Sequence, residues 1–273
     1  AVPFQNKDWR VGVYFNIAHN ENKITEMPDN YIEENYTFGN GNYAYRREEG
    51  RPMGSFYGYR YKGVYQNKDA TYARDIEGNV MKDISGNAIV MRNGSYTVAP
   101  GDAIYEDVNH DGVINQYDIV YLGNSNPRLT GGAGLNVSYK QFKLSAIFYG
   151  RYGQDVVNAT RLNNESMRGI DNQSTAVLRR WRNEGDQTDI PRALYGEGYN
   201  TLGSDRFVED ASYLRLKSLS FTYRLPKKAI QRWGFNNIDV YVTGYNLFTW
   251  TKYTGQDPEV KTENTYARDT ATT

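Results

Sequence analysis

Cysteine is absent from the 273-residue sequence, and this absence excludes several chemistries at once. Without a thiol there is no disulfide, no cysteine nucleophile, no iron–sulfur cluster and no Cys-ligated zinc. Histidine occurs only twice, as His19 and His110, so neither a histidine-based triad nor a multi-histidine metal site is expected. The formal net charge is zero, because 32 Lys and Arg residues balance 32 Asp and Glu residues. This balance argues against a nucleic-acid partner, which needs a basic surface.

Long apolar runs are missing as well. The mean hydropathy is -0.76, and no stretch approaches the ~18 apolar residues that indicate a transmembrane helix. The start of the chain, Ala1-Val2-Pro3-Phe4, has neither an initiator methionine nor a signal peptide, so we expect a mature or cut chain. In contrast, the sequence holds 25 tyrosines and 26 glycines. This composition predicts an all-β protein.

A polar β-rich chain can still span a membrane, because a transmembrane β-strand needs only ~9–11 residues of alternating pattern. Apolar and polar residues alternate in five segments: 9–18, 135–140, 142–149, 219–225 and 238–245. The two-residue turn Lys140-Gln141 predicts a hairpin. A change of phase near Lys217-Ser218 predicts a β-bulge. Residues 226–237 form a second turn, with one or two helical turns behind Pro226.

The alternation also predicts the orientation of the side chains. The residues expected to face lipid are Phe15, Val137, Phe148, Phe221 and Val242, and those expected to face the lumen are Tyr14, Tyr149, Arg224 and Tyr241. The aromatic residues Phe248, Trp250 and Tyr253 indicate a belt at the membrane interface. Pattern alone leaves open a soluble β-sandwich with ordinary core faces.

The connections between the segments favour the membrane protein. Long connections run at about 19–128 and 153–212, whereas the other connections are short. Short periplasmic turns that alternate with long extracellular loops are typical of outer-membrane barrels. Within the first connection, Asp75–Val80 recurs as Asp83–Ala88, which predicts a small β-meander. It could serve as a lid or docking surface, or only stiffen the loop.

Several blocks of sequence resemble the SusC/RagA family of TonB-dependent outer-membrane transporters. The blocks are GDAIYEDVNHDG at 101–112, GNSNP at 123–127, DIPR at 189–192, DRFVEDASYLRLK at 205–217, NLFTWTKY at 246–253 and DPEV at 257–260. The likeness runs from about Trp9 to Val260, in order and with suitable spacing. A soluble, calcium-stabilised carbohydrate-binding or dockerin-like module is the alternative, although a dockerin needs a duplicated loop with helices.

The resemblance implies a carboxy-terminal portion of a roughly 22-stranded transmembrane β-barrel. Neither the plug domain nor the final strand of the family is recognised in residues 1–273, and an odd count of five strands agrees with an incomplete barrel. The implied function is import of glycan fragments or oligopeptides, together with a SusD-like surface lipoprotein. TonB would act through the plug and not through this segment. The implied location is the outer membrane of a Gram-negative, Bacteroidetes-like bacterium, with the rest of the barrel and lipid as neighbours.

Candidate ligand contacts lie in the second long connection. They are Arg161, Asn163, Asn164, Arg168, Trp181, Tyr195 and Tyr199. Flat aromatic rings can stack on sugars, and Asn or Arg can reach hydroxyls or carbonyls. The alternative is that these side chains pack the loop against the barrel or the lipoprotein. The carboxylates Asp205, Glu209 and Asp210 could be read as a glycosidase pair, but nothing else supports an enzyme.

The first long connection also contains a calcium-loop pattern, Asp107-x-Asn109-x-Asp111-Gly112-x-Ile114-Asn115-x-x-Asp118. Oxygen ligands would come from the side chains Asp107, Asn109, Asp111, Asn115 and Asp118, and from the carbonyl of Val113. Asp in place of Glu at the last position shortens the reach, so magnesium is the alternative ion. A metal-free, Asx-rich turn would show the same residue types.

Overall fold

The computed structural model describes residues 2–27, 43, 47–259, 262–263 and 266–267. The chain divides into two compact units, each assembled from separate stretches of sequence. The first unit comprises Ala1–Glu21, Asn126–Gln154 and Asp210–Tyr253, and the second comprises Asn22–Ser125, Asp155–Glu209 and Thr254–Thr273. Within the described ranges, no helix is long and apolar enough to cross a membrane.

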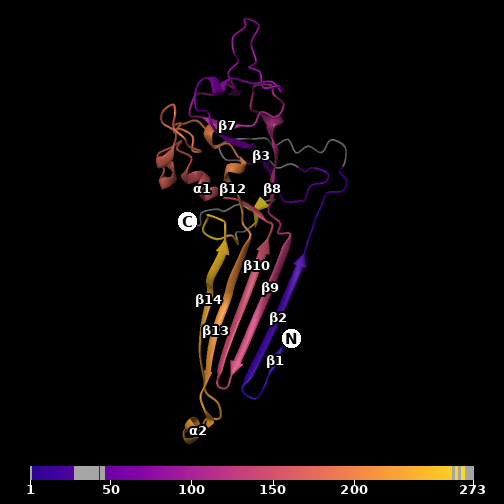
Figure 1. Cartoon of the computed structure of the whole chain (residues 1–273), viewed down its shortest axis with the longest axis vertical. Coiled ribbons are helices and arrows are strands. Elements are labelled where there is room, and N and C mark those ends of the chain that lie inside the picture. The colour runs from indigo at the N-terminus through magenta and orange to yellow at the C-terminus, as the bar shows by residue number, and fades with distance from the viewer. Residues whose placement is uncertain (1, 28–42, 44–46, 260–261, 264–265, 268–273) are drawn as a thin grey trace. The chain divides into compact units, whose positions relative to one another are not determined.

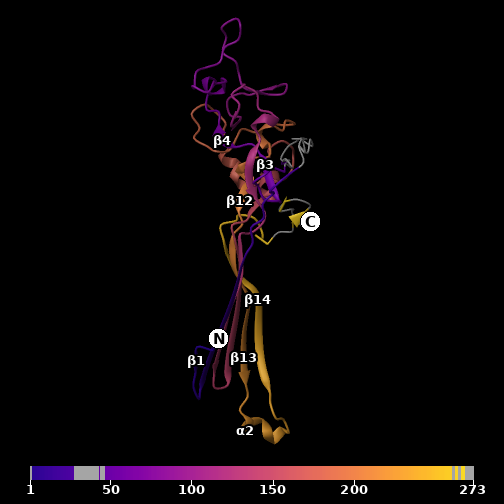
Figure 2. The ribbon, with the colours of Figure 1, turned by 90° about the vertical axis from the view of Figure 1, so that its right-hand side faces the viewer.

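The first unit is an antiparallel sheet. Its strands, in spatial order, are β1 (Phe4–Gln5), β2 (Trp9–His19), β9 (Leu129–Tyr139), β10 (Phe142–Tyr152), β13 (Tyr213–Arg224) and β14 (Asp239–Thr251). The five long strands lie side by side (Figure 1), and a view turned by 90° shows them as a single twisted layer (Figure 2). The five predicted strands are therefore confirmed. The structure adds β1, which at two residues is too short to show alternation.

The register of the sheet confirms the predicted faces. One row of paired residues crosses all five long strands on the first face, and it consists of Val11, Val137, Leu144, Phe221 and Val242. The adjacent row on the other face consists of Gly12, Asn136, Ser145, Ser220 and Thr243. Hydrogen bonds cross this polar row, from the Ser145 hydroxyl to Asn136 at 2.7 Å and from Thr243 to Ser220 at 2.9 Å. The first face therefore suits lipid and the second a wet lumen.

The turns and the bulge also follow the sequence. The register of β13 shifts between Leu216 and Ser218 against β14, as the change of phase predicted. At the tight turn between β9 and β10, Lys140 has φ 50°, a left-handed conformation that such turns require. After Pro226, the short helices α2 (Lys227–Ile230) and η6 (Gln231–Trp233) supply the predicted helical turns.

Aromatic residues gather at both ends of the apolar face. A row of four aromatic residues, which was not predicted, lies near the short turns and is paired across four strands. It consists of Trp9, Tyr139, Phe142 and Tyr223. Near the long connections, the rings of Phe248 and Trp250 stack at 6.1 Å. Eight residues of β10 separate the row of Phe142 from the row of Trp250, about 27 Å along a strand, close to the ~25 Å apolar band of outer-membrane barrels. The prediction for Tyr253 was wrong, because this residue follows the end of β14 and is buried.

The second unit consists of short elements from the two long connections and from the residues after β14. They are β3 (Ser55–Gly58), β4 (Tyr61–Val64), η1 (Asp69–Thr71), β5 (Arg92–Asn93), β6 (Tyr96–Thr97), β7 (Ala103–Tyr105), η2 (Gln116–Asp118), β8 (Val120–Asn124), β11 (Asp155–Val157), α1 (Ala159–Asn164), η3 (Thr175–Arg179), η4 (Tyr199–Thr201), η5 (Asp205–Phe207), β12 (Val208–Asp210), β15 (Thr262–Glu263) and β16 (Tyr266–Ala267). The pairs β3–β8, β4–β7 and β5–β6 are antiparallel. β12 ends at Asp210, where the first unit resumes.

The eight-residue repeat forms two neighbouring hairpins, as the sequence predicted. Bridges pair Arg74 with Val80 and Lys82 with Ala88. In each turn the aspartate accepts backbone N–H bonds, so that Asp75 holds Asn79 at 2.8 Å and Asp83 does the same in the second turn. These bonds to the carboxylate lower the pKa of Asp75 below its usual range. The turns are therefore stabilised locally by their own side chains.

Candidate functional site

Both long connections contribute to one tyrosine-rich core in the second unit. The fully enclosed rings of Tyr57, Tyr59 and Tyr105 come from the first connection, and Tyr199 comes from the second. The Tyr105 ring meets the Tyr199 ring edge-on at 5.4 Å, and the Tyr105 hydroxyl donates to the Tyr199 carbonyl at 3.0 Å. Burial raises the pKa of the Tyr199 hydroxyl well above its usual range. The two connections therefore fold together.

An ion pair joins two of the sequence blocks inside this unit. Asp102 is fully buried, and its Oδ1 accepts from Nε of Arg192 at 2.7 Å. The same carboxylate accepts from the Tyr96 hydroxyl at 2.7 Å, from the Ala99 N–H at 2.8 Å and from the Asn200 amide at 3.2 Å. The hydrogen bond to Asp102 raises the pKa of Arg192. Asp102 thus links residues about ninety positions apart.

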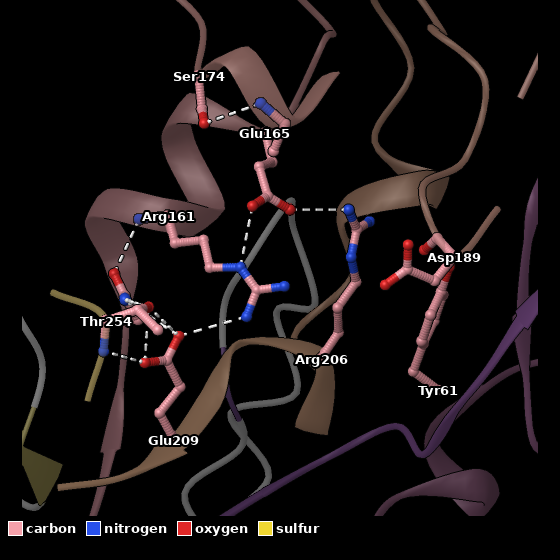
Figure 3. A network of polar contacts seen from close by, with 10 residues as sticks. Tyr61, Arg161, Glu165, Ser174, Asp189, Arg206, Glu209 and Thr254 are labelled. Carbon is pink, nitrogen blue, oxygen red and sulfur yellow. Dashed lines mark hydrogen bonds and ion pairs between the residues drawn. The ribbon is translucent and has the colours of Figure 1, made fainter. Parts of the chain in front are cut away.

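A second polar network holds helix α1 against the segment that precedes β13 (Figure 3). Glu165 lies between Arg161 and Arg206, with both N–O distances at 2.9 Å. Arg161 also reaches Glu209 at 3.2 Å, and Glu209 accepts from the Thr254 N–H at 2.8 Å. The side chains of Glu165 and Arg206 are only 5% and 6% exposed. Because these charges are paired and shielded from solvent, they fix α1 in position relative to the segment before β13.

The polar network extends to the rings around Arg206. Its guanidinium lies 5.4 Å from the centre of the Tyr61 ring, and the Tyr61 hydroxyl donates to the carbonyl of Asp189 at 2.6 Å. The Tyr61 N–H donates to Asp205 at 2.7 Å, and burial raises the pKa of the Asp205 carboxyl. Figure 3 shows Arg206 between Glu165 and the Tyr61–Asp189 pair. The carboxylates of Glu165 and Asp205 therefore stabilise the packing of these segments.

A polar hollow of about 540 Å³ lies in the second unit beside the end of α1. It is lined by Leu162, Asn163, Asn164, Ser166, Arg168, Gly169, Asp171, Asn172 and Thr201. The helix that presents the first of these residues is capped by Asn158, which accepts the Arg161 N–H at 2.9 Å. Amide, hydroxyl, guanidinium and carboxylate groups together can bind sugar hydroxyls or peptide groups.

The structure separates the seven predicted ligand residues into groups. Asn163, Asn164 and Arg168 come together in the polar hollow. Tyr195 is 77% exposed and lies outside that hollow. Three others occupy packing positions: Arg161 in the ion network, and Trp181 and Tyr199 in the interior.

Trp181 illustrates the packing alternative. A Cβ atom at Gly101 would approach the Trp181 ring to 2.3 Å, and Gly101 has φ +89°. Only glycine fits under this ring, so the first residue of the block at 101–112 is explained by packing. The sequence missed Ser166, Asp171, Asn172 and Thr201 as hollow residues. Thr201 in particular has no local signal, because only the fold brings η4 beside α1.

The calcium-loop residues bond mainly to nearby backbone. Asp107 accepts the N–H of Gly112 at 2.8 Å, and Asp111 accepts that of Val113 at 2.7 Å. Asp118 is fully buried, with its two oxygens on the N–H groups of Val108 and Asn115, both at 2.8 Å. Among the residues that the structure describes, no three acidic or histidine side chains are grouped to hold a metal ion. The calcium site stays a prediction.

The three carboxylates considered for an enzyme have separate partners. Asp205 accepts from Tyr61, Glu209 binds Arg161, and the Oδ1 of Asp210 accepts the Ser212 N–H at 2.9 Å. They are used individually as structural acceptors.

The two-faced antiparallel sheet, with short turns at one end of its strands and a folded loop unit formed from the long connections, defines a segment of an outer-membrane β-barrel. The chain is 32% identical over 266 residues to the TonB-dependent receptor P3 of Formosa agariphila, which covers 95% of this chain and 24% of the receptor. It is 28% identical over 270 residues to the TonB-dependent receptor SusC of Bacteroides thetaiotaomicron, covering 96% and 23%.

Among solved structures, the RagAB peptide transporter matches with a TM-score of 0.66 at 26% identity, over 94% of this chain and 25% of that one. No protein-family model matches the chain. The chain is thus SusC/RagA-like, and it spans about a quarter of the length of the curated relatives it matches. These relatives are receptors and transporters and not enzymes.

Proposed function

We propose that the chain forms part of the wall and the extracellular loop unit of a TonB-dependent importer in the outer membrane of a Bacteroidetes-like bacterium. The observation that carries the proposal is the continuous apolar face of the sheet, opposite a polar face, in a chain similar to TonB-dependent receptors over 95% of its length. The proposed cargo is glycan fragments or oligopeptides. A SusD-like surface lipoprotein is the proposed partner, and TonB would act through the plug.

The polar hollow beside α1 is the proposed contact for this cargo. Its side chains offer donors and acceptors in the loop unit, where an extracellular ligand arrives before transport. Three of the side chains, Asn163, Asn164 and Arg168, are of the types that reach hydroxyls or peptide carbonyls.

Uptake by cells tests both statements. Cells that lack the full-length gene are complemented with the wild type, and uptake of fluorescent oligopeptide and oligosaccharide pools is measured with and without a protonophore. We expect uptake of one pool that depends on both the gene and the energised inner membrane. The double variant Asn163→Ala, Asn164→Ala should raise the cargo concentration for half-maximal uptake about tenfold, because two hydrogen bonds are lost.

Asn183→Ala is the matched control, because Asn183 lies in the same connection but outside the hollow. Uptake of both pools without the gene would contradict the importer. Equal uptake by the control and the double variant would contradict the hollow as the cargo contact.

For the Asp107 loop we propose calcium, with magnesium as the alternative, on the strength of the ligand spacing alone. Hydrogen exchange of peptides covering 107–118 should slow in millimolar calcium, while exchange in β9 and β10 stays unchanged. Asp111→Ala should remove the slowing, because it takes away one oxygen ligand. If calcium and magnesium leave exchange unchanged in the wild type, the loop is an Asx-rich turn without an ion.

A further inference from the structure

A second hollow, of about 810 Å³, lies on the sheet of the first unit where the strands lead into the long connections. Strands β2, β9, β10, β13 and β14 all contribute to it. Its volume falls within the ~300–1,000 Å³ of typical ligand sites. Most of its surface is apolar, in contrast to the polar hollow of the second unit.

The floor of this hollow is made by small residues. Gly131 of β9 pairs with Gly150 of β10, and Ala133 lies two residues further on the same face. A Cβ at Gly131 would approach the carbonyl oxygen of Asn16 to 2.8 Å, and one at Gly150 that of Tyr213 to 2.9 Å. Because the backbones come this close, side chains cannot fill the space. The hollow is therefore built into the sheet.

Large apolar side chains border the floor. Ile17 and Leu214 pair with Gly131 and Gly150, and so share their face. Next to them, the rings of Phe148 and Trp250 lie 6.5 Å apart with 28° between their planes. This face continues the row that meets lipid, and Ile17 is 70% exposed. A hollow of this lining on a lipid-facing surface fits a hydrocarbon chain.

A lysine side chain, that of Lys252, lies at the end of the hollow toward the long connections. Lys252 lines it, directly after β14, and has no hydrogen-bond or ion-pair partner among the described residues. The other charged residues of the lining are engaged: Nε of Arg151 donates to the Tyr149 hydroxyl at 3.2 Å, and Asp210 holds the Ser212 N–H. Lysine beside exposed aromatic rings is typical of the membrane interface, where its ammonium meets lipid phosphates.

We propose that this hollow binds one acyl chain of a phosphate-bearing lipid of the outer leaflet, with the phosphate on Lys252. The long connections of such barrels are extracellular, which places this end of the sheet in the outer leaflet. The lipid would fill the gap left by Gly131, Ala133 and Gly150. The inference requires a membrane-spanning sheet and goes beyond the import function.

Lipid retention tests the inference. The full-length transporter is delipidated in detergent and titrated with dimyristoyl phosphatidylglycerol, and bound lipids are counted by native mass spectrometry. The wild type should hold one lipid that Ala133→Trp does not, because the indole fills the floor. Val137→Trp is the matched control, since Val137 lies on the same strand and face but outside the hollow, and should bind like the wild type.

Lys252→Gln should weaken phosphatidylglycerol binding about fivefold and leave binding of dimyristoylglycerol, which lacks phosphate, unchanged. Equal retention by Ala133→Trp and Val137→Trp would overturn the acyl-chain site, and equal weakening for both lipids would overturn the role of Lys252. Heat-dependent migration in electrophoresis shows whether each variant has an assembled barrel. If Ala133→Trp does not assemble, Ala133→Leu is used in its place. If the wild type imports its cargo but retains no lipid, the lipid site is refuted while the proposed import function stands.

Discussion

Replacement of Val242 by arginine is expected to destabilise the assembled barrel by about 2–4 kcal/mol, whereas Tyr241→Arg should cost much less. The two residues are neighbours on β14 with similar exposure, 67% for Val242 and 72% for Tyr241. They differ in face: Val242 pairs with Phe221 in the apolar row, and Tyr241 pairs with Thr222 on the polar side. The difference in cost therefore measures the difference between lipid and water.

The measurement is reversible unfolding of the full-length transporter in lipid vesicles by urea or guanidinium. Val242→Leu serves as a second control, because it keeps the apolar contact at the same depth and should change stability by less than about 1.5 kcal/mol. Equal tolerance of Val242→Arg and Tyr241→Arg would mean that both faces meet water, and would contradict a membrane-spanning sheet.

The faces of the sheet could be predicted because they follow from a period of two. Lipid accepts only apolar side chains, so Val11, Val137 and Val242 mark their strands without any knowledge of their neighbours. The start of β9 could not be predicted in this way. Gly131, Gly132 and Gly134 carry no side chain and interrupt the alternation, so the strand was expected to begin later than Leu129.

The folding of the two long connections into one unit was beyond local pattern. Its contacts join residues far apart, such as Tyr105 with Tyr199, and no periodicity reports them. The abundance of tyrosine predicts β-strands, but composition alone does not indicate that several of these rings form a core. Sequence does not distinguish the two uses of Trp181 and Tyr199 either, since a flat ring can stack on a ligand or fill an interior, and the structure buries both.

The sequence blocks gain a physical explanation from the second unit. Gly101 fits under the ring of Trp181, and Phe207 is fully buried. Asp102 meets Arg192, and Arg206 meets Glu165. These residues from separate blocks hold the loop unit together, whereas the polar hollow uses residues outside the blocks, such as Asn163. The resemblance therefore reflects the residues that hold this unit together.

Substitution of Asp102 by asparagine is expected to destabilise the loop unit by about 3 kcal/mol. The carboxylate is 0% exposed and accepts from Arg192, Tyr96, Ala99 and Asn200. An amide has one acceptor oxygen in place of two, and its NH2 group would face donors, so the half-buried guanidinium of Arg192 and several N–H or O–H groups would lose an acceptor. Because the contacts join both long connections, the loss should spread through the tyrosine core.

Hydrogen exchange of the full-length transporter measures this effect, since peptides around Tyr105 and Tyr199 should lose protection together while β9 and β10 keep theirs. Glu106→Gln is the matched control: Glu106 pairs with Arg60 and Lys62 near the surface, where an ion pair contributes only ~0–1 kcal/mol. A double-mutant cycle with Arg192→Gln isolates the coupling to that residue. If Asp102→Asn exchanges no faster than Glu106→Gln, the buried carboxylate is not what holds the two connections together.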